Sequence, residues 1–177
     1  TFAEAESLLE RVEQGQASVD PEYLKTLLHM LIAREGPFLD LAMRYFTIKD
    51  LVQIRRRMIG TGMIGGKAVG MLLARAILEK TDPKWQSILE PHDSFYVGAD
   101  VFYTYLVQNG CWWMMQRHKM DLSDDETETA RRRILAGEFP DYIVKQFYDL
   151  LEYFGQSPII VRSSSLLEDN FGNAFAG

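Results

Sequence analysis

The glycine-rich segment 60–70, which reads GTGMIGGKAVG, divides this chain of 177 residues into two parts of different character. Before it, apolar residues recur with the spacing of amphipathic helices, as in residues 24–31. After it, helical patterns alternate with short β-branched or aromatic runs. We therefore predict a helical N-terminal extension over residues 1–59 and an α+β unit, helix-rich with a small sheet, over residues 60–177.

Several local signals predict elements in the second part. SDDE at 123–126 is a capping box that should begin a helix. The segment SFYVGADVFYTYL begins as a strand and should become helical near Asp100. Residues 143–154 carry the strongest amphipathic stripe, and Gly155 should end that helix. The apolar run 158–162 then predicts a buried strand.

Composition narrows the functional classes. A net charge of −6 and a pI near 5.1 argue against a nucleic-acid binder. Cys111 is the only cysteine, and His29, His92 and His118 are scattered, so no spacing typical of metal ligands is present. Because a single cysteine cannot form a disulfide within the chain, a reducing, cytoplasmic compartment is expected. No secretory leader is visible in the first residues, and no apolar run approaches the ~20 residues that cross a bilayer. The first residue is not Met and the last lies in a loop, so we expect a piece of a longer protein.

Two common nucleotide-binding motifs fit the glycine segment poorly. A Walker P-loop would need a glycine where Thr61 stands and a hydroxyl where Ala68 stands. Gly60, Gly62 and Gly65 do match the dinucleotide pattern G-x-G-x-x-G, but that pattern must follow a buried strand. The preceding residues IRRRMI do not read as one.

A simpler hypothesis is an anion site in the second half of the segment. Gly65 and Gly66 allow close backbone approach, and Lys67 adds a positive charge at a helix N-terminus. A lysine there opposes the helix dipole, and a bound phosphate would remove that conflict. The alternative is a surface lysine beside a flexible helix cap.

A second cation stands at the end of the predicted strand. The guanidinium of Arg162 can bind phosphate oxygens in a fork, and Ser163 and Ser164 add donors. The terminal FGNAFAG could fold over such a ligand. The alternative is an ion pair of Arg162 with Glu168 or Asp169 that orders a loop. Together with the lysine of the glycine segment, this pattern suggests a polyphosphate held between a helix start and a strand end.

These motifs resemble the nucleotide-binding domain of the pyruvate phosphate dikinase and phosphoenolpyruvate synthase (pyruvate, water dikinase) family. The family carries a Gly-Gly-Lys, here at 65–67, and a Val-Arg-Ser-Ser, here at 161–164. Its Glu-Asp and Phe-Ala-Gly sequences stand here at 168–169 and 175–177. The resemblance covers about residues 60–177.

The resemblance implies an ATP-grasp fold, of which this chain would hold the first subdomain. It implies that Lys67 and Arg162 contact ATP phosphates and that the loop from Gly172 closes over them. The nucleotide-binding residues it implies are Gly65, Gly66, Lys67, Arg162, Ser163, Ser164 and Gly172.

The resemblance also implies parts that residues 1–177 lack. In the family, Mg²⁺ ligands, a phosphohistidine domain and a substrate domain follow the phosphate loop in the same polypeptide. We therefore expect an ATP-binding piece of a phosphotransferase, with ATP and Mg²⁺ as cofactors and with no activity of its own. No residue is assigned a catalytic role, and the phosphoryl acceptor and oligomeric state stay open. The alternative function is a non-catalytic module that senses ATP or docks a partner through its helices.

Overall fold

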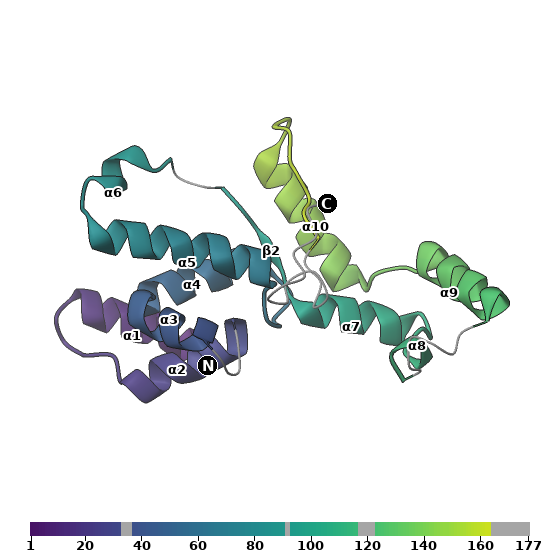
Figure 1. Cartoon of the computed structure of the whole chain (residues 1–177), viewed down its shortest axis with the longest axis horizontal. Helices are drawn as coiled ribbons and strands as arrows, with labels where there is room; N and C mark the ends of the chain where they lie inside the picture. Colours follow the sequence, from purple (N-terminus) through teal and green to yellow (C-terminus); the bar gives the residue numbers. More distant parts are fainter. Residues whose placement is uncertain (33–36, 91–92, 117–122, 164–177) are drawn as a thin grey trace.

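The computed structural model describes residues 1–32, 37–90, 93–116 and 123–163, which form ten helices and two short strands (Figure 1). The predicted α+β composition, rich in helix with a small sheet, is confirmed. In chain order the elements are α1 (Phe2–Glu13), α2 (Pro21–Leu31), α3 (Pro37–Tyr45), α4 (Ile48–Arg56), β1 (Met58–Ile59), α5 (Gly66–Thr81), α6 (Trp85–Ile88), β2 (Tyr96–Val97), α7 (Ala99–Gln108), α8 (Trp113–Gln116), α9 (Asp124–Ala136) and α10 (Asp141–Phe154).

Side-chain caps set where several helices begin. The predicted box at the start of α9 is present, because the Ser123 hydroxyl accepts from the Glu126 amide at 3.3 Å. Thr47 and Asp50 form the same reciprocal pair at the start of α4. At the other end of a helix, Gly155 follows α10 with φ 57°, a conformation that favours glycine.

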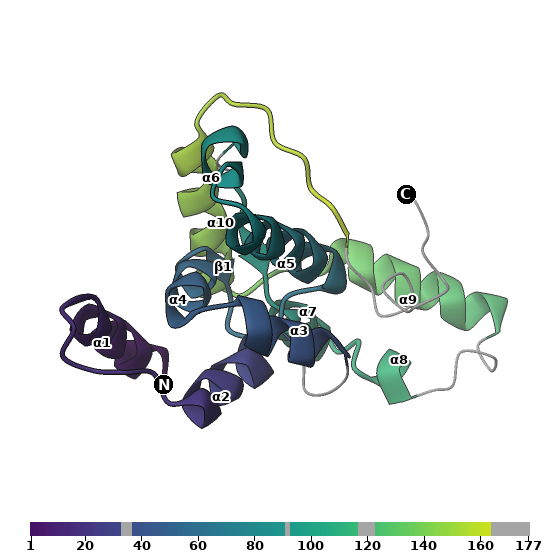
Figure 2. The same ribbon diagram turned by 60° about the vertical axis from the view of Figure 1, so that its left-hand side comes forward.

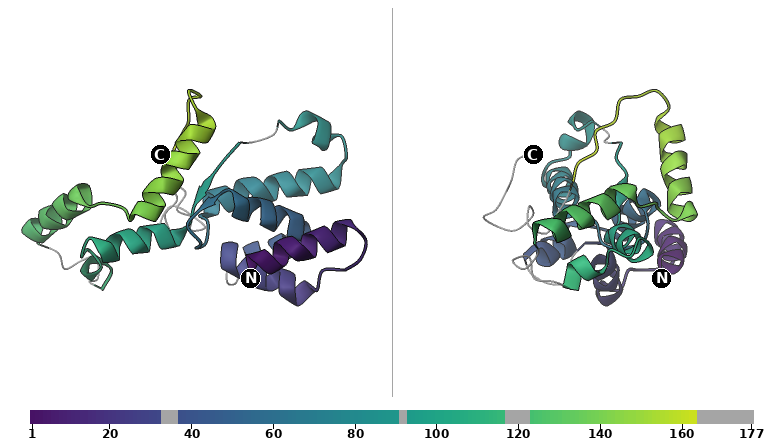
Figure 3. Two further views of the ribbon diagram at one scale, coloured as in Figure 1. Left: turned by 180° about the vertical axis from the view of Figure 1, so that it is seen from behind. Right: turned by 90° about the vertical axis from the view of Figure 1, so that its right-hand side faces the viewer.

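The larger apolar core joins the first five helices. Leu28, Leu31 and Leu51 are fully buried, and they belong to one cluster with Leu73 of α5 and Tyr96 of β2. Figure 1 shows α1–α5 gathered at one end, and Figure 3 shows from behind that α8 and α9 lie at the other. The helices before residue 60 therefore pack directly on the first helix after it.

The two strands form a parallel pair at the centre of the molecule. Met58 is opposite Tyr96 and Ile59 is opposite Val97, with α5 in the connection between the strands. Ile59 also packs with Val101 and with Ile143 of α10, in a smaller second core. A buried strand thus does precede Gly60, although IRRRMI does not read as one, because two residues are too few to show a strand pattern.

The predicted buried strand over 158–162 is wrong. These residues follow α10 without strand pairing, and Ile160 and Val161 are 88% and 89% exposed. A β-branched run becomes a buried strand only where a neighbouring strand completes its hydrogen bonds and another layer covers its side chains. Within the described residues, neither β1 nor β2 pairs with it.

This exposure gives a stability prediction. The double variant Ile160→Ser/Val161→Ser should change the free energy of unfolding by less than ~0.5 kcal/mol, because surface side chains contribute little. Ile143→Ala, at a buried position of α10, should cost ~2–5 kcal/mol in the same urea titration. A loss above ~2 kcal/mol in the double variant would show that the run is buried after all.

No helix in the described parts of the chain is both long enough and apolar enough to span a membrane.

Candidate functional site

The first half of the glycine segment is bound to a carboxylate of the same chain. Asp100, in the first turn of α7, accepts from the Thr61 amide at 2.9 Å and from the Gly62 amide at 2.7 Å. It also accepts from the Thr61 hydroxyl at 3.1 Å. Hydrogen bonds to a charged acceptor are the stronger kind, so Asp100 anchors this part of the loop.

Three glycines leave room for that carboxylate. A Cβ atom at Gly60 or Gly98 would lie 2.7 Å or 2.5 Å from Asp100 Oδ1, and one at Gly62 would lie 2.6 Å from the Asp100 amide nitrogen. Gly60 also has φ 79°, which side chains rarely adopt. Gly60 and Gly62 thus have a structural reason to be glycine that does not involve a ligand.

Sequence reasoning missed Asp100. A signal was available, because an acidic residue follows Gly98 where a strand turns into a helix. Two parallel strands bring their carboxyl ends to the same edge of the sheet, so the loops after β1 and β2 must meet. An acidic side chain on one loop then has the amides of the other within reach.

Two more side chains hold Gly60 in place. Its amide donates to Gln146 Oε1 of α10 at 3.1 Å, and its carbonyl accepts from Arg55 Nη1 of α4 at 3.2 Å. The loop is therefore tied to helices on both sides.

The second half of the segment forms the start of α5. Gly65 is the N-cap of α5 and provides no side-chain hydrogen bond to the first amides of the helix. Helix α5 begins at Gly66, and its first turn holds no acidic residue. Lys67 Nζ donates to the carbonyl oxygen of Ser163 at 3.2 Å, across 96 positions of sequence. Figure 2 shows the segment after α10 running back toward the start of α5.

The structure thus brings together part of the predicted constellation. Gly65, Gly66 and Lys67 meet the segment that carries Arg162 and Ser163. The Arg162 side chain is exposed next to this contact. Outside the described residues lie Ser164, Gly172 and the carboxylates considered as ion-pair partners of Arg162.

An ion pair anchors the far end of α10, from which that segment leaves. Arg57 donates to Asp93, which also accepts from the Tyr153 hydroxyl at 3.2 Å. The guanidinium lies 5.3 Å from the ring centre of Phe95 and 5.8 Å from that of Tyr153. The hydrogen bond to Asp93 is the main cause that raises the pKa of Arg57 above its ordinary value.

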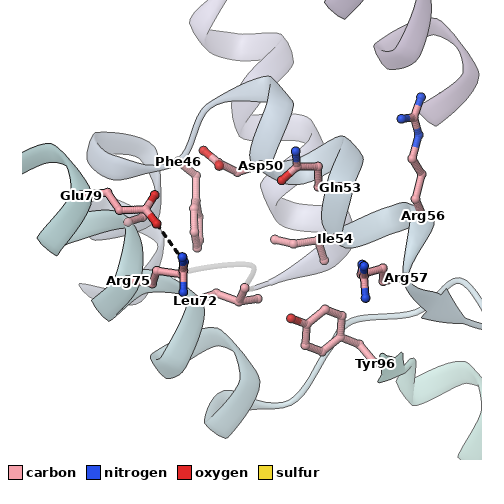
Figure 4. Close-up of a pocket in the computed structure, with 11 residues that line it drawn as sticks. Phe46, Asp50, Gln53, Ile54, Arg56, Arg57, Leu72, Arg75, Glu79 and Tyr96 are labelled. Atoms are coloured by element: carbon pink, nitrogen blue, oxygen red, sulfur yellow. Dashed lines mark ion pairs between the residues drawn. The ribbon is translucent and has the colours of Figure 1, made fainter. Parts of the chain in front are cut away.

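A separate cavity of about 470 Å³ lies between α4, α5 and β2 (Figure 4). Ion pairs engage its arginines, since Arg56 contacts Glu6 at 2.8 Å and Arg75 contacts Glu79 at 2.8 Å. Burial raises the pKa of the Tyr96 hydroxyl in its wall. Lys67 does not line this cavity, so the cavity is not part of the glycine-loop site.

The described residues do not fit a magnesium site. Within them, no three His, Cys, Asp or Glu side chains come together as metal ligands. The nearest carboxylate to the loop, Asp100, already accepts from backbone amides. We therefore assign no metal to these residues.

A glycine-flanked helix start with a lysine in its first turn, opposite an Arg-Ser segment, is an arrangement typical of phosphate-binding proteins. The family model "Pyruvate phosphate dikinase, AMP/ATP-binding domain" matches residues 61–177, more than half of the chain. The chain belongs to this family, as the motifs predicted. The family's description as an AMP/ATP-binding domain supports ATP as the ligand. No curated protein and no solved structure matched the chain.

Proposed function

We propose that this chain binds the phosphates of ATP between the start of α5 and the segment that follows α10, as the nucleotide-binding part of a dikinase-like phosphotransferase with an ATP-grasp fold. The observation that supports this most is the contact of Lys67 with Ser163. It joins the two motifs of the family pattern, although nothing local in the sequence forces them together. The family match over both motifs supports the same conclusion.

Each residue has a distinct proposed role. The Gly65–Gly66 backbone approaches the phosphates at the positive end of α5, and Lys67 supplies a point charge there. Arg162 contributes a planar guanidinium that suits two phosphate oxygens at once. Ser163, Ser164 and the loop from Gly172 complete the proposed site.

The remaining chemistry is proposed to come from other parts of the same polypeptide. The family resemblance assigns the Mg²⁺ ligands and the phosphohistidine and substrate domains to positions after the phosphate loop. Phosphoryl transfer depends on charge stabilisation by metal ions at the γ-phosphate. Residues 1–177 are therefore proposed to bind ATP without transferring its phosphate, and residues 1–59 to form a helical extension of the domain.

Titration of the 177-residue protein with ATP tests this function. We expect a dissociation constant in the millimolar range or weaker, because each charged hydrogen bond contributes ~1.5–3 kcal/mol before the entropic cost of binding. We also expect no phosphate release above background. Micromolar affinity, or turnover that disappears in Lys67→Ala, would show a complete active site within this chain.

A second candidate is a module that senses ATP without catalysis. Helices α1–α4 share a core with α5, the helix that carries Lys67, so ligand binding at α5 could affect them. The two candidates differ in a cellular assay of the natural protein: a phosphotransferase loses phosphoryl transfer on Lys67→Ala, whereas a sensor has none to lose.

A further inference from the structure

We propose that Asp100 is a positioning residue for nucleotide binding: its carboxylate holds Thr61 and Gly62 so that the Gly65–Lys67 turn faces the phosphates. This inference rests on the proposed function. It divides the glycine segment into an anchored first half and a ligand-facing second half. The family match and the sequence motifs assign no role to Asp100.

The anchor is built for a carboxylate and leaves no room there for a phosphate. Asp100 engages both the Thr61 and Gly62 amides, the donors that a phosphate would need. The space that Gly60, Gly62 and Gly98 leave open is filled by Asp100 itself. Within the glycine segment, only the second half therefore has room to bind a nucleotide phosphate.

The geometry also argues against a dinucleotide site, despite the strand that precedes Gly60. In such a site the first turn of the glycine pattern cradles the pyrophosphate at a helix N-terminus. Here the Thr61 and Gly62 amides face Asp100, and α5 begins only at Gly66.

The short connection from the anchor to Lys67 is held along its length. The Ala99 amide donates to the Met63 carbonyl at 2.9 Å, and the Ile64 amide donates to the Leu31 carbonyl at 2.8 Å. The Ile64 side chain is 4% exposed and belongs to the larger core. The bonds to Asp100 and the contacts of Met63 and Ile64 therefore fix the approach to Gly65 together.

The test compares Asp100→Asn with a matched control, Asp50→Asn. Asp50 also accepts from a backbone amide and a hydroxyl, both of Thr47 and both at 2.7 Å, but it belongs to the capping box of α4. Each variant of the 177-residue protein is titrated with ATP and followed by the amide resonances of Gly66 and Lys67. Hydrogen exchange of the Thr61 and Gly62 amides and a urea midpoint are measured on the same samples.

We expect Asp100→Asn to weaken ATP binding ~10-fold, as the loss of a charge-assisted hydrogen bond would. It should also shift the Gly66 resonance without ligand and accelerate exchange at Thr61 and Gly62. Asp50→Asn should lower the urea midpoint but leave ATP affinity and the Gly66 resonance unchanged. Unchanged ATP affinity in folded Asp100→Asn would overturn the positioning role, as would an equal loss in both variants.

Two further outcomes are informative. If the unsubstituted protein binds no ATP, the proposed function fails. Separately, unaltered hydrogen exchange of the Thr61 and Gly62 amides in Asp100→Asn would show that Asp100 does not hold these two residues. If Asp100→Asn does not fold, Thr61→Val removes only the hydroxyl bond to Asp100. That variant should weaken ATP binding ~3-fold, about half the effect in free energy, and unchanged affinity would overturn the inference.

Discussion

Gly62→Ala is expected to lower the free energy of unfolding by about 3 kcal/mol or more. The new Cβ would lie 2.6 Å from the Asp100 amide nitrogen and 3.1 Å from that of Ala99, and these backbone atoms cannot move aside as a side chain can. Overpacking of this kind costs ~1–3 kcal/mol. Displacing Asp100 from the loop amides would add ~1.5–3 kcal/mol for hydrogen bonds to a charged group.

Gly70→Ala provides the matched control for this substitution. Gly70 lies inside α5, and a Cβ there would meet nothing within 4 Å. Alanine is the better helix former, so this change should raise the free energy of unfolding by ~0.5–1 kcal/mol. Urea denaturation followed by circular dichroism measures both variants. Equal stability of the two would show that the glycine segment and Asp100 are not in contact.

Lys67→Ala and Arg162→Ala should each weaken ATP binding by ~10-fold or more. Each removes one cation from the proposed phosphate site, and ~1.4 kcal/mol corresponds to tenfold in affinity. Neither change should destabilise the fold, because the Arg162 side chain is exposed and the Lys67 ammonium contacts an exposed carbonyl. Amide chemical-shift titration with ATP measures the affinities in the range expected here.

The control for these two variants is Lys49→Ala. Lys49 is an exposed cation on α4 that pairs with Glu13 at 3.4 Å, away from the start of α5. It should leave ATP affinity unchanged while altering the net charge equally. If all three variants weaken binding alike, the effect is one of overall charge, and the proposed site is wrong.

Local signals were enough to predict the start of α9 and the end of α10. Capping at Ser123 and the glycine stop at Gly155 depend on a few neighbouring residues, and both were correct. The family was also identified from short motifs near Lys67 and Arg162. The roles of these residues toward ATP stay predictions.

Features that depend on distant partners could not be predicted in the same way. The strand over 58–59 is too short for a periodic pattern and exists because Tyr96 and Val97 pair with it. The apolar run 158–162 has a strand composition but lacks strand partners within the described residues. The anchoring of Thr61 by Asp100 joins positions that only the parallel sheet brings together.

The shared core of α1–α4 and α5 has a consequence for shortening this protein. The family match begins at residue 61, yet Leu72 and Leu73 of α5 are buried in a cluster with Leu27 and Leu51 from the helices before it. A protein cut before residue 61 would expose these leucines to water as an apolar patch. The N-terminal helices therefore cover an apolar face of α5, although the family match does not include them.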